Sequence, residues 1–361
     1  MTSVVVVNNH EALFGGAERQ ISELANYLTD HNYKVTIAST VMCPEFKQSL
    51  KEARICETGT DQGLLEFVAK YARKFDIVNP HNHPTELFHQ YTQKNKVVWQ
   101  CNEVPGYVLE GKEVDPNERA YINRTISKVM VITDFDRARF KTLYGQDAIT
   151  NYPGVHYDFF AKDVKVRNTL NMKDNFVITQ VNYFTWTKQQ DKSIEIFAKV
   201  KKDIPEAKLV LVGFNAWATQ YPFVKKVHDK IEELGLEDDV FISDYLQGDE
   251  NLRNIYNQTD VCLQPVLAQG AYATVFEGIS AGIPSVVSED FVASSLVLNN
   301  QLGWLSSQSI DEYANKICMI YSDYQRCKEE TMEYRSWIKD NLTWEKFGEN
   351  YCKVFEGVLS S

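Results

Sequence analysis

The sequence has no long apolar run and no excess of basic residues. No stretch of about 18 consecutive apolar residues occurs, so we expect no membrane-spanning helix. The formal net charge is −11, which argues against the strongly basic surface of a nucleic-acid-binding protein. Residues 4–7 are apolar but have no basic residues before them, so we expect a first β-strand there and not a signal peptide.

Paired cysteines are also lacking. The seven cysteines form no CxxC motif, and their odd number argues against a disulfide framework. We therefore expect a cytoplasmic protein in a reducing compartment. Lysine pairs at 201–202 and 225–226 leave open a peripheral contact with a membrane surface, beside their ordinary interpretation as solvated helix surface.

What the sequence does contain is a regular alternation of strand-like and helix-like segments. Continuous apolar runs such as 96–101 and 176–181 are separated by segments in which apolar residues recur with helical spacing. Buried strands that alternate with helices are typical of doubly wound parallel sheets. The tail from residue 310 reads as helices only. A length of 361 residues fits two such domains.

The segment TNYPGVHYDFF at 150–160 interrupts this alternation, and its Pro153–Gly154 pair indicates a turn. We therefore predict an N-terminal domain over residues 1–153, rejoined by a C-terminal helix at 342–361, and a second domain over 154–341. Ligands bind beyond the carboxyl ends of strands in open parallel sheets. The expected architecture is two tandem Rossmann-like domains that face a central cleft.

Several motifs occur in a characteristic order: FGGAERQISELANYL, NYPGVHYDFF, LEDDVFIS and LQPVLAQGAYATVFEGISAGIPSVVS. In these motifs, and in the LGWL turn at 302–305, the chain resembles the group 1 retaining glycosyltransferases of family 4, which have the GT-B fold. The resemblance covers nearly the whole chain. It implies a nucleotide-diphospho-sugar donor, UDP- or GDP-linked, on the C-terminal domain and a carbohydrate or lipid-linked acceptor on the N-terminal domain. It implies no further cofactor and no metal.

The resemblance assigns the nucleotide to the long motif. Glu277 stands where the family binds the ribose hydroxyls, although an acid at a helix start is also favoured by the helix dipole. We expect that helix at 275–282, preceded by backbone N–H groups that face the diphosphate. Tyr272 replaces a family glycine that lets the backbone approach the phosphates. The diphosphate positions are Tyr272, Ala273 and Thr274.

Four positions depart from the family pattern: Asn102, Tyr183, Gln269 and Tyr272. Gln269 replaces a glutamate beside the donor sugar and so loses its negative charge. Asn102 stands where the family often has a histidine near the reacting centre, and asparagine does not exchange a proton near neutral pH. Asn102 and Gln269 are the catalytic candidates. Tyr183 stands at the arginine of the family's diphosphate clamp, of which Lys188 keeps the lysine.

The remaining candidates follow strands of the N-terminal domain. Gly15 and Gly16 are expected to open the first helix, with Gly16 near the donor phosphate. The other acceptor-side candidates are His10, His81, His83 and Glu103. His81 and His83 form a His-x-His pair, but no acidic or thiol partner lies near it in the sequence, so a metal site is disfavoured. Residues 134–136 (DFD) imitate a metal motif but follow Thr133, which we interpret as a helix N-cap.

Three other functions remain as alternatives. The four departures allow a catalytically weakened nucleotide-sugar-binding or scaffold protein on the same fold. A nicotinamide-dependent dehydrogenase would need a GxGxxG motif after the first strand, and the chain has none. A phosphorylase or a sugar-nucleotide epimerase of related fold is the third. The leading prediction is a metal-independent hexosyltransferase in glycan biosynthesis.

Overall fold

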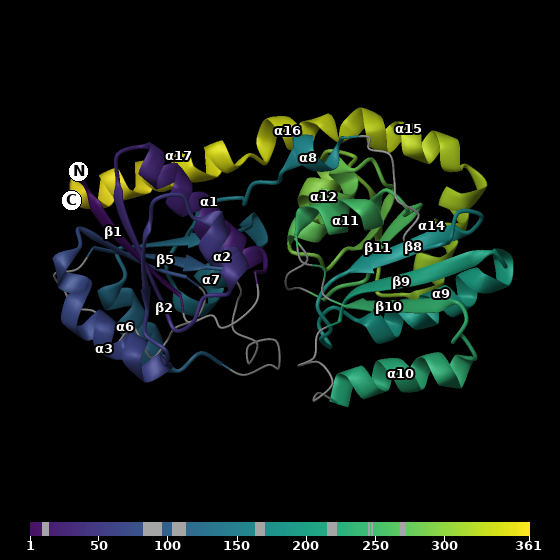
Figure 1. Ribbon diagram of the computed structural model, residues 1–361, viewed down its shortest axis with the longest axis horizontal. Coiled ribbons are helices and arrows are strands. Elements are labelled where there is room, and N and C mark those ends of the chain that lie inside the picture. The colour runs from purple at the N-terminus through teal and green to yellow at the C-terminus, as the bar shows by residue number, and fades with distance from the viewer. Residues whose placement is uncertain are drawn as a thin grey trace. The chain divides into compact units, whose positions relative to one another are not determined.

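The chain folds into two compact units, which are shown in the computed structural model of Figure 1. Unit 1 comprises Met1–Gly154 and Leu342–Ser361, and unit 2 comprises Val155–Asn341. The structure describes residues 1–8, 14–81, 96–102, 113–162, 170–214, 222–244, 246, 248–267 and 272–361.

Unit 1 is built on a parallel sheet with the strand order β3-β2-β1-β4-β5-β6-β7. Its strands are β1 (Ser3–Asn8), β2 (Lys34–Ser39), β3 (Arg54–Glu57), β4 (Ile77–Pro80), β5 (Lys96–Cys101), β6 (Lys128–Val131) and β7 (Ile149–Thr150). Its described helices are α1 (Gly16–Asp30), α2 (Pro44–Ser49), α3 (Asp61–Tyr71), the 3-10 helix η1 (Ala72–Lys74), α6 (Pro116–Thr125), α7 (Asp134–Tyr144) and α17 (Trp344–Leu359).

Both faces of this sheet are buried, as the continuous apolar strands predict. In β1, Val4 and Val6 belong to the core cluster that includes α1 and α17, while Val5 and Val7 belong to the cluster on the opposite face. Successive side chains of a strand point to opposite faces. The four valines of β1 therefore pack into the hydrophobic cores on both faces of the sheet.

Helix α17 carries the chain's C-terminal residues into the core of unit 1. Phe347, Tyr351 and Phe355 pack against residues of β1 and α1. A Cβ atom at Gly348 would lie 2.2 Å from the Tyr27 ring, so the close packing of α17 on α1 requires glycine there. The Asn151 side-chain amide, 196 residues before Phe347 in the chain, donates to the Phe347 carbonyl of this helix over 3.1 Å.

Unit 2 has a second parallel sheet with the order β10-β9-β8-β11-β12-β13. Its strands are β8 (Phe176–Val181), β9 (Ala207–Phe214), β10 (Val240–Asp244), β11 (Val261–Gln264), β12 (Ser285–Ser288) and β13 (Trp304–Ser306). Its described helices are α8 (Tyr157–Phe160), α9 (Gln190–Asp203), α10 (Pro222–Leu234), α11 (Asp249–Tyr256), α12 (Tyr272–Ser280), α13 (Ser294–Asn299), α14 (Ile310–Ser322), α15 (Tyr324–Tyr334) and α16 (Ser336–Asn341). Two doubly wound parallel sheets, predicted from the sequence, are confirmed.

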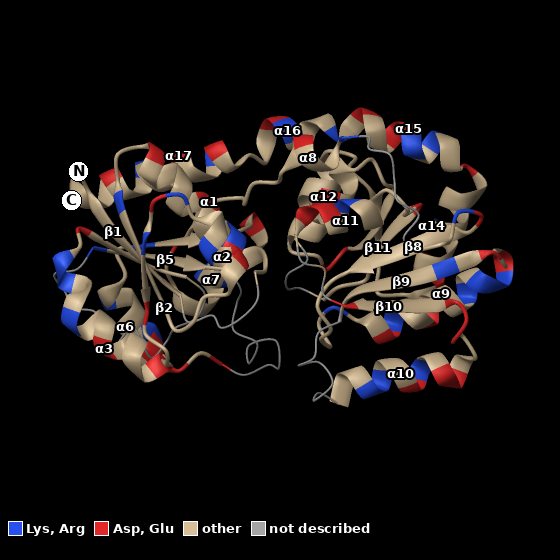
Figure 2. Cartoon of the chain, viewed as in Figure 1, with Lys and Arg blue, Asp and Glu red and all other residues tan. Residues whose placement is uncertain are grey.

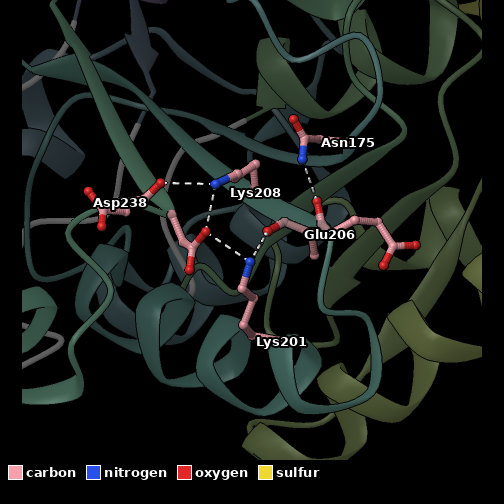
Figure 3. A network of polar contacts seen from close by, with 7 residues as sticks. Asn175, Lys201, Glu206, Lys208 and Asp238 are labelled. Atoms are coloured by element: carbon pink, nitrogen blue, oxygen red, sulfur yellow. Dashed lines mark hydrogen bonds and ion pairs between the residues drawn. The ribbon is translucent and has the colours of Figure 1, made fainter.

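Charged residues lie mainly on the helices of both units, as Figure 2 shows. The lysine pairs of unit 2 are largely engaged with acids. Lys201 and Lys208 both donate to Asp239, over 2.8 and 2.7 Å (Figure 3). Partial burial opposes ionisation of Asp239, but the hydrogen bonds from these lysines outweigh it and lower the pKa of the carboxyl. Lys225 and Lys226 pair with Asp229 and Asp191, which favours the ordinary interpretation of these basic clusters.

Some expected elements differ from the structure. Residues 302–305, expected to form a turn, include the start of β13, which adds an edge strand to the second sheet. Helix α12 begins at Tyr272 and not at 275, and α9 begins at Gln190 and not at 188. The helix expected at 84–93 lies outside the described residues. Among the described helices, none is long and apolar enough to cross a membrane.

Candidate functional site

The carboxyl edge of the second sheet has a switch point between β8 and β11. From β8 the chain proceeds outward through β9 and β10, and then returns to the other side of β8 with β11. Loops diverge at such a point, and ligands of doubly wound sheets bind there. Asn182 follows β8 and Gln264 ends β11, and the Asn182 amide donates to Gln264 Oε1 over 2.6 Å. The two loops are thereby joined at the switch point.

The loop after β8, residues 182–189, is held by further contacts. The Leu267 N–H donates to the Thr187 carbonyl over 2.9 Å, which ties the loop after β11 to this segment a second time. Gly213 in β9 has a φ of +112°, and a Cβ atom there would lie 2.4 Å from the Asn182 carbonyl oxygen. Glycine is therefore required where β9 meets this loop.

Lys188 lies in that loop and is only 2% exposed. Its Nζ lies 5.4 Å from the centre of the Tyr183 ring. Its carbonyl accepts a 2.6 Å hydrogen bond from the Gln180 side chain, which in turn accepts from Ser193. Burial of an ammonium group is unfavourable unless charge or dipoles compensate it. Lys188 is therefore not an ordinary surface lysine.

Tyr183, which stands in the family's arginine position, is half exposed. Its ring provides a cation–π contact to Lys188 but no second positive charge. A second partly buried cation that the sequence did not indicate is Lys192, in the first turn of α9, whose ammonium group donates to both oxygens of Gln308, in the loop after β13. Burial lowers the pKa of Lys192. The sequence carried no signal for this contact, because Gln308 is 116 residues from Lys192 in the chain.

Helix α12 follows the loop after β11. Tyr272, Ala273 and Thr274 form its first turn, so their N–H groups point out of its positive end. The Tyr272 backbone is helical, so the tyrosine that replaces a family glycine causes no positive-φ strain. Its ring is buried and lies 4.8 Å from that of Phe276. The residues expected before the helix are thus its first turn.

Glu277 lies in the second turn of α12, five residues after its first, and is 5% exposed. The alternative that it is a helix-start acid stabilised by the dipole is therefore wrong. Burial raises the pKa of the neighbouring Tyr256 hydroxyl, and the negative charge of Glu277 raises it further. The Tyr256 hydroxyl donates to the Thr274 carbonyl over 3.1 Å. A buried carboxylate close to a helix N-terminus is suited to accept hydrogen bonds from a ligand's hydroxyl groups.

In unit 1, the corresponding switch point lies between β1 and β4. His81 follows β4, donates its N–H to the Val7 carbonyl over 2.9 Å, and pairs with Gln100 of β5. Asn102 follows β5, and both His81 and Asn102 are buried. The structure therefore places these two candidates after adjacent strands, at one edge of one sheet.

Two further predictions of unit 1 concern helix starts. Helix α1 begins at Gly16, as expected, and Glu18 accepts a 2.9 Å hydrogen bond from the Gly15 N–H. Neither glycine has a positive φ, so local backbone strain does not explain them. Thr133 caps α7 by accepting from the Asp136 N–H over 3.1 Å, which confirms the interpretation of DFD as a helix start.

Four candidates lie outside the described residues: His10, His83, Glu103 and Gln269. Their predicted roles stay predictions. The described candidates separate into two groups, one on each sheet. Lys188, Tyr183, Tyr272, Ala273, Thr274 and Glu277 belong to unit 2, and Gly15, Gly16, His81 and Asn102 belong to unit 1.

Known structures share this architecture of two parallel-sheet units. The chain superimposes on Anabaena HepE in complex with UDP-glucose with a TM-score of 0.84 and 17% identity, over 99% of this chain and all of that one. It superimposes on the sucrose-phosphate synthase of Thermosynechococcus elongatus with a TM-score of 0.83 and 16% identity, over the full length of both. The fold is that of the GT-B glycosyltransferases.

Residues 162–336, which lie wholly within unit 2, match the family model described as Glycosyl transferases group 1. The resemblance to the group 1 glycosyltransferases is therefore confirmed. The chain is 22% identical over 243 residues to a GDP-mannose-dependent alpha-(1-6)-phosphatidylinositol monomannoside mannosyltransferase of Mycolicibacterium smegmatis. It is 27% identical over 256 residues to the mannosylfructose-phosphate synthase of Agrobacterium fabrum. These matches span 63% of this chain, and 62% and 56% of the two relatives.

Proposed function

We propose that this protein is a retaining glycosyltransferase that moves a sugar from a nucleotide-diphospho-sugar to a carbohydrate or lipid-linked acceptor. The observation that carries the proposal is the carboxyl edge of unit 2. There a buried lysine, Lys188, precedes α9, and a buried glutamate, Glu277, lies in the second turn of α12. A cation and a helix N-terminus suit the diphosphate of a nucleoside diphosphate, and a carboxylate suits its ribose hydroxyls.

In this proposal each group has one task. Glu277 accepts hydrogen bonds from the ribose hydroxyls, and the first turn of α12 faces the diphosphate. Lys188 offsets the negative charge that grows on the diphosphate as the bond from the sugar's anomeric carbon to the phosphate oxygen breaks. The acceptor hydroxyl forms the new bond on the same face of the sugar, and its proton passes to the departing diphosphate. We propose that these groups suffice without a metal ion, so that a chelator leaves the rate unchanged.

The donor is tested first by thermal unfolding against a panel of nucleotides and nucleotide sugars. A ligand that binds only the folded protein raises its melting temperature, by an amount set by its affinity. One relative is named GDP-mannose-dependent and one similar structure holds UDP-glucose, so the panel covers both bases with glucose and mannose. If no nucleotide raises the melting temperature, the proposed donor site is wrong.

Turnover is tested by release of nucleoside diphosphate in the presence of candidate acceptors. Lys188→Met keeps the volume and apolar stem of the side chain but removes its charge. Because charge-assisted hydrogen bonds are each worth about 1.5–3 kcal/mol, this variant should lose about 10- to 100-fold in affinity for the donor. Lys226→Met, which removes an exposed lysine of the same unit, is the matched control. Equal rates in both variants would contradict the proposal.

A weakened nucleotide-sugar binder is the second candidate, favoured by the half-exposed Tyr183 in the arginine position. The two functions separate in Gln269→Glu, which restores the family's carboxylate. If missing charge limits the native protein, turnover should rise at least about tenfold, because electrostatic stabilisation is often the largest catalytic effect. If the native protein binds a donor but turns none over, and this variant does, the binder is favoured.

A further inference from the structure

Five buried polar side chains form a connected network at the carboxyl edge of the unit 1 sheet. We call Asn79, His81, Gln100, Asn102 and Tyr351 the edge network. Four of them belong to or follow β4 and β5, and Tyr351 reaches them from α17. All five are buried. Buried donors are hydrogen-bonded to acceptors, so each bond of the edge network can be assigned a donor and an acceptor. We call this assignment the direction of the network.

The direction starts at Asn79. Its amide nitrogen donates to the Val98 carbonyl over 2.6 Å, and that carbonyl can only accept. Its Oδ1 therefore faces His81, at 2.9 Å from Nε2. Because Oδ1 is an acceptor, Nε2 of His81 must carry the proton. Nδ1 of His81 is then an acceptor, and it has no hydrogen-bond partner among the residues that the structure describes.

The same reasoning reaches Asn102 through Tyr351. The Asn79 amide also bonds to the Tyr351 hydroxyl, which accepts that bond and donates its own proton to Gln100 Oε1 over 2.5 Å. Gln100 Nε2 then donates to Asn102 Oδ1 over 3.0 Å. The Asn102 amide is thereby oriented, with its oxygen toward Gln100 and its nitrogen on the side away from Gln100.

We propose that Tyr351, on the C-terminal helix, is a positioning residue that acts through Gln100 to hold the Asn102 side chain in one amide orientation, and that the transfer reaction depends on this orientation. The inference rests on the proposed function only for the identity of that reaction. The direction of the edge network is a property of the folded chain. An amide can exchange its oxygen and nitrogen by a half-turn at little steric cost. The hydroxyl of Tyr351 is the contact that decides between the two orientations at Gln100.

Tyr351→Phe removes this hydroxyl and leaves the ring in the core. Gln100 and Asn102 are then able to adopt either amide orientation. We expect kcat to fall about tenfold, as small misplacements of site groups do, while KM for the nucleotide sugar on unit 2 stays within about twofold. Tyr144→Phe is the matched control, since Tyr144 is a buried tyrosine of the same unit that stacks on Phe140 in another part of the core. An equal loss of kcat in both variants would overturn the proposal.

A double variant tests whether Tyr351 acts through Asn102. Asn102→Ala removes the amide that is being oriented. In that background Tyr351→Phe should change kcat by less than about twofold, because two residues that act as one unit are not additive. A full further tenfold loss would show that Tyr351 acts by another route and would contradict the proposal.

The ring nitrogen chemical shifts of His81 test the network without any activity. We expect the tautomer protonated at Nε2 in the wild type, and also in Tyr351→Phe, where Val98 still orients Asn79. A proton on Nδ1 in the wild type would reverse the network and overturn the inference. If the protein transfers no sugar but shows the expected tautomer, only the proposed function fails.

Discussion

Asn182 and Gln264 are joined by a 2.6 Å hydrogen bond between their buried side-chain amides. The two residues are 82 positions apart; Asn182 follows β8 and Gln264 ends the neighbouring strand β11, on either side of the switch point. The loop that carries Lys188 starts at this bond.

We predict that Asn182→Ala lowers the free energy of unfolding by about 1–3 kcal/mol, because it leaves Gln264 Oε1 buried without its donor. Replacing both partners by apolar residues, in Asn182→Ala with Gln264→Leu, should recover part of that loss. Urea unfolding of the four proteins in this cycle measures the coupling. Strict additivity would contradict a direct bond between the two amides.

Gly213→Ala should lower the unfolding free energy by more than the addition of one methyl group suggests. The residue has a φ of +112°, and the added Cβ would lie 2.4 Å from the Asn182 carbonyl oxygen. Gly235→Ala is the matched control, since Gly235 has a φ of +64° but open space around its Cβ position. Backbone strain alone costs about 1 kcal/mol. We expect Gly213→Ala to lower the unfolding free energy by at least about 2 kcal/mol more than the control, and to weaken nucleotide binding.

The sequence predicted both sheets and the position of most strands, because buried parallel strands are continuous apolar runs. It predicted β8 at 176–181 with the observed bounds, and a helix start after Thr133, where α7 begins at Asp134. It did not predict the edge strands β3, β7 and β13. These strands have four, two and three residues, which is too few to show an apolar pattern.

The sequence likewise predicted only part of the candidate site. Motif spacing drew attention to Lys188, Glu277, His81 and Asn102. It did not show that Lys188 is buried or that Glu277 lies in the second helical turn, because burial and helix starts depend on tertiary packing. Nor did it indicate Tyr351, which is 249 residues from Asn102 in the chain and meets its network only because α17 packs on unit 1.

Tyr183→Arg should strengthen donor binding. Tyr183 is half exposed, so an arginine is accommodated without displacing core residues, and it would add the second cation that the resemblance implies. One charge-assisted contact to a phosphate is worth about 1.5–3 kcal/mol, which predicts an affinity about 10-fold or more higher for the nucleoside diphosphate. Calorimetry at two salt concentrations measures it, and the gain should shrink at high salt. Tyr183→Leu, which adds no charge, should show no gain.

Acid should destabilise the protein partly through His81. Burial lowers the pKa of the folded His81 imidazole to about 3, whereas the unfolded residue titrates near about 6.5. Between these values the unfolded chain binds a proton that the folded protein does not. The stability due to neutral His81 is therefore fully present above pH about 6.5 and is lost progressively as the pH falls toward 3.

At pH 5 this difference amounts to about 2 kcal/mol of unfolding free energy relative to pH 7.5. His81→Gln carries no titrating group at this position. Between pH 7.5 and pH 5 its unfolding free energy should therefore fall by about 2 kcal/mol less than that of the wild type. Urea unfolding of both proteins at the two pH values measures the difference, and the other histidines cancel in the comparison. Parallel decreases in the two proteins would mean that His81 is protonated in the folded state. Nε2 of a doubly protonated ring would still donate to Asn79 Oδ1, so the direction of the edge network is tested by the tautomer of His81 and not by this comparison.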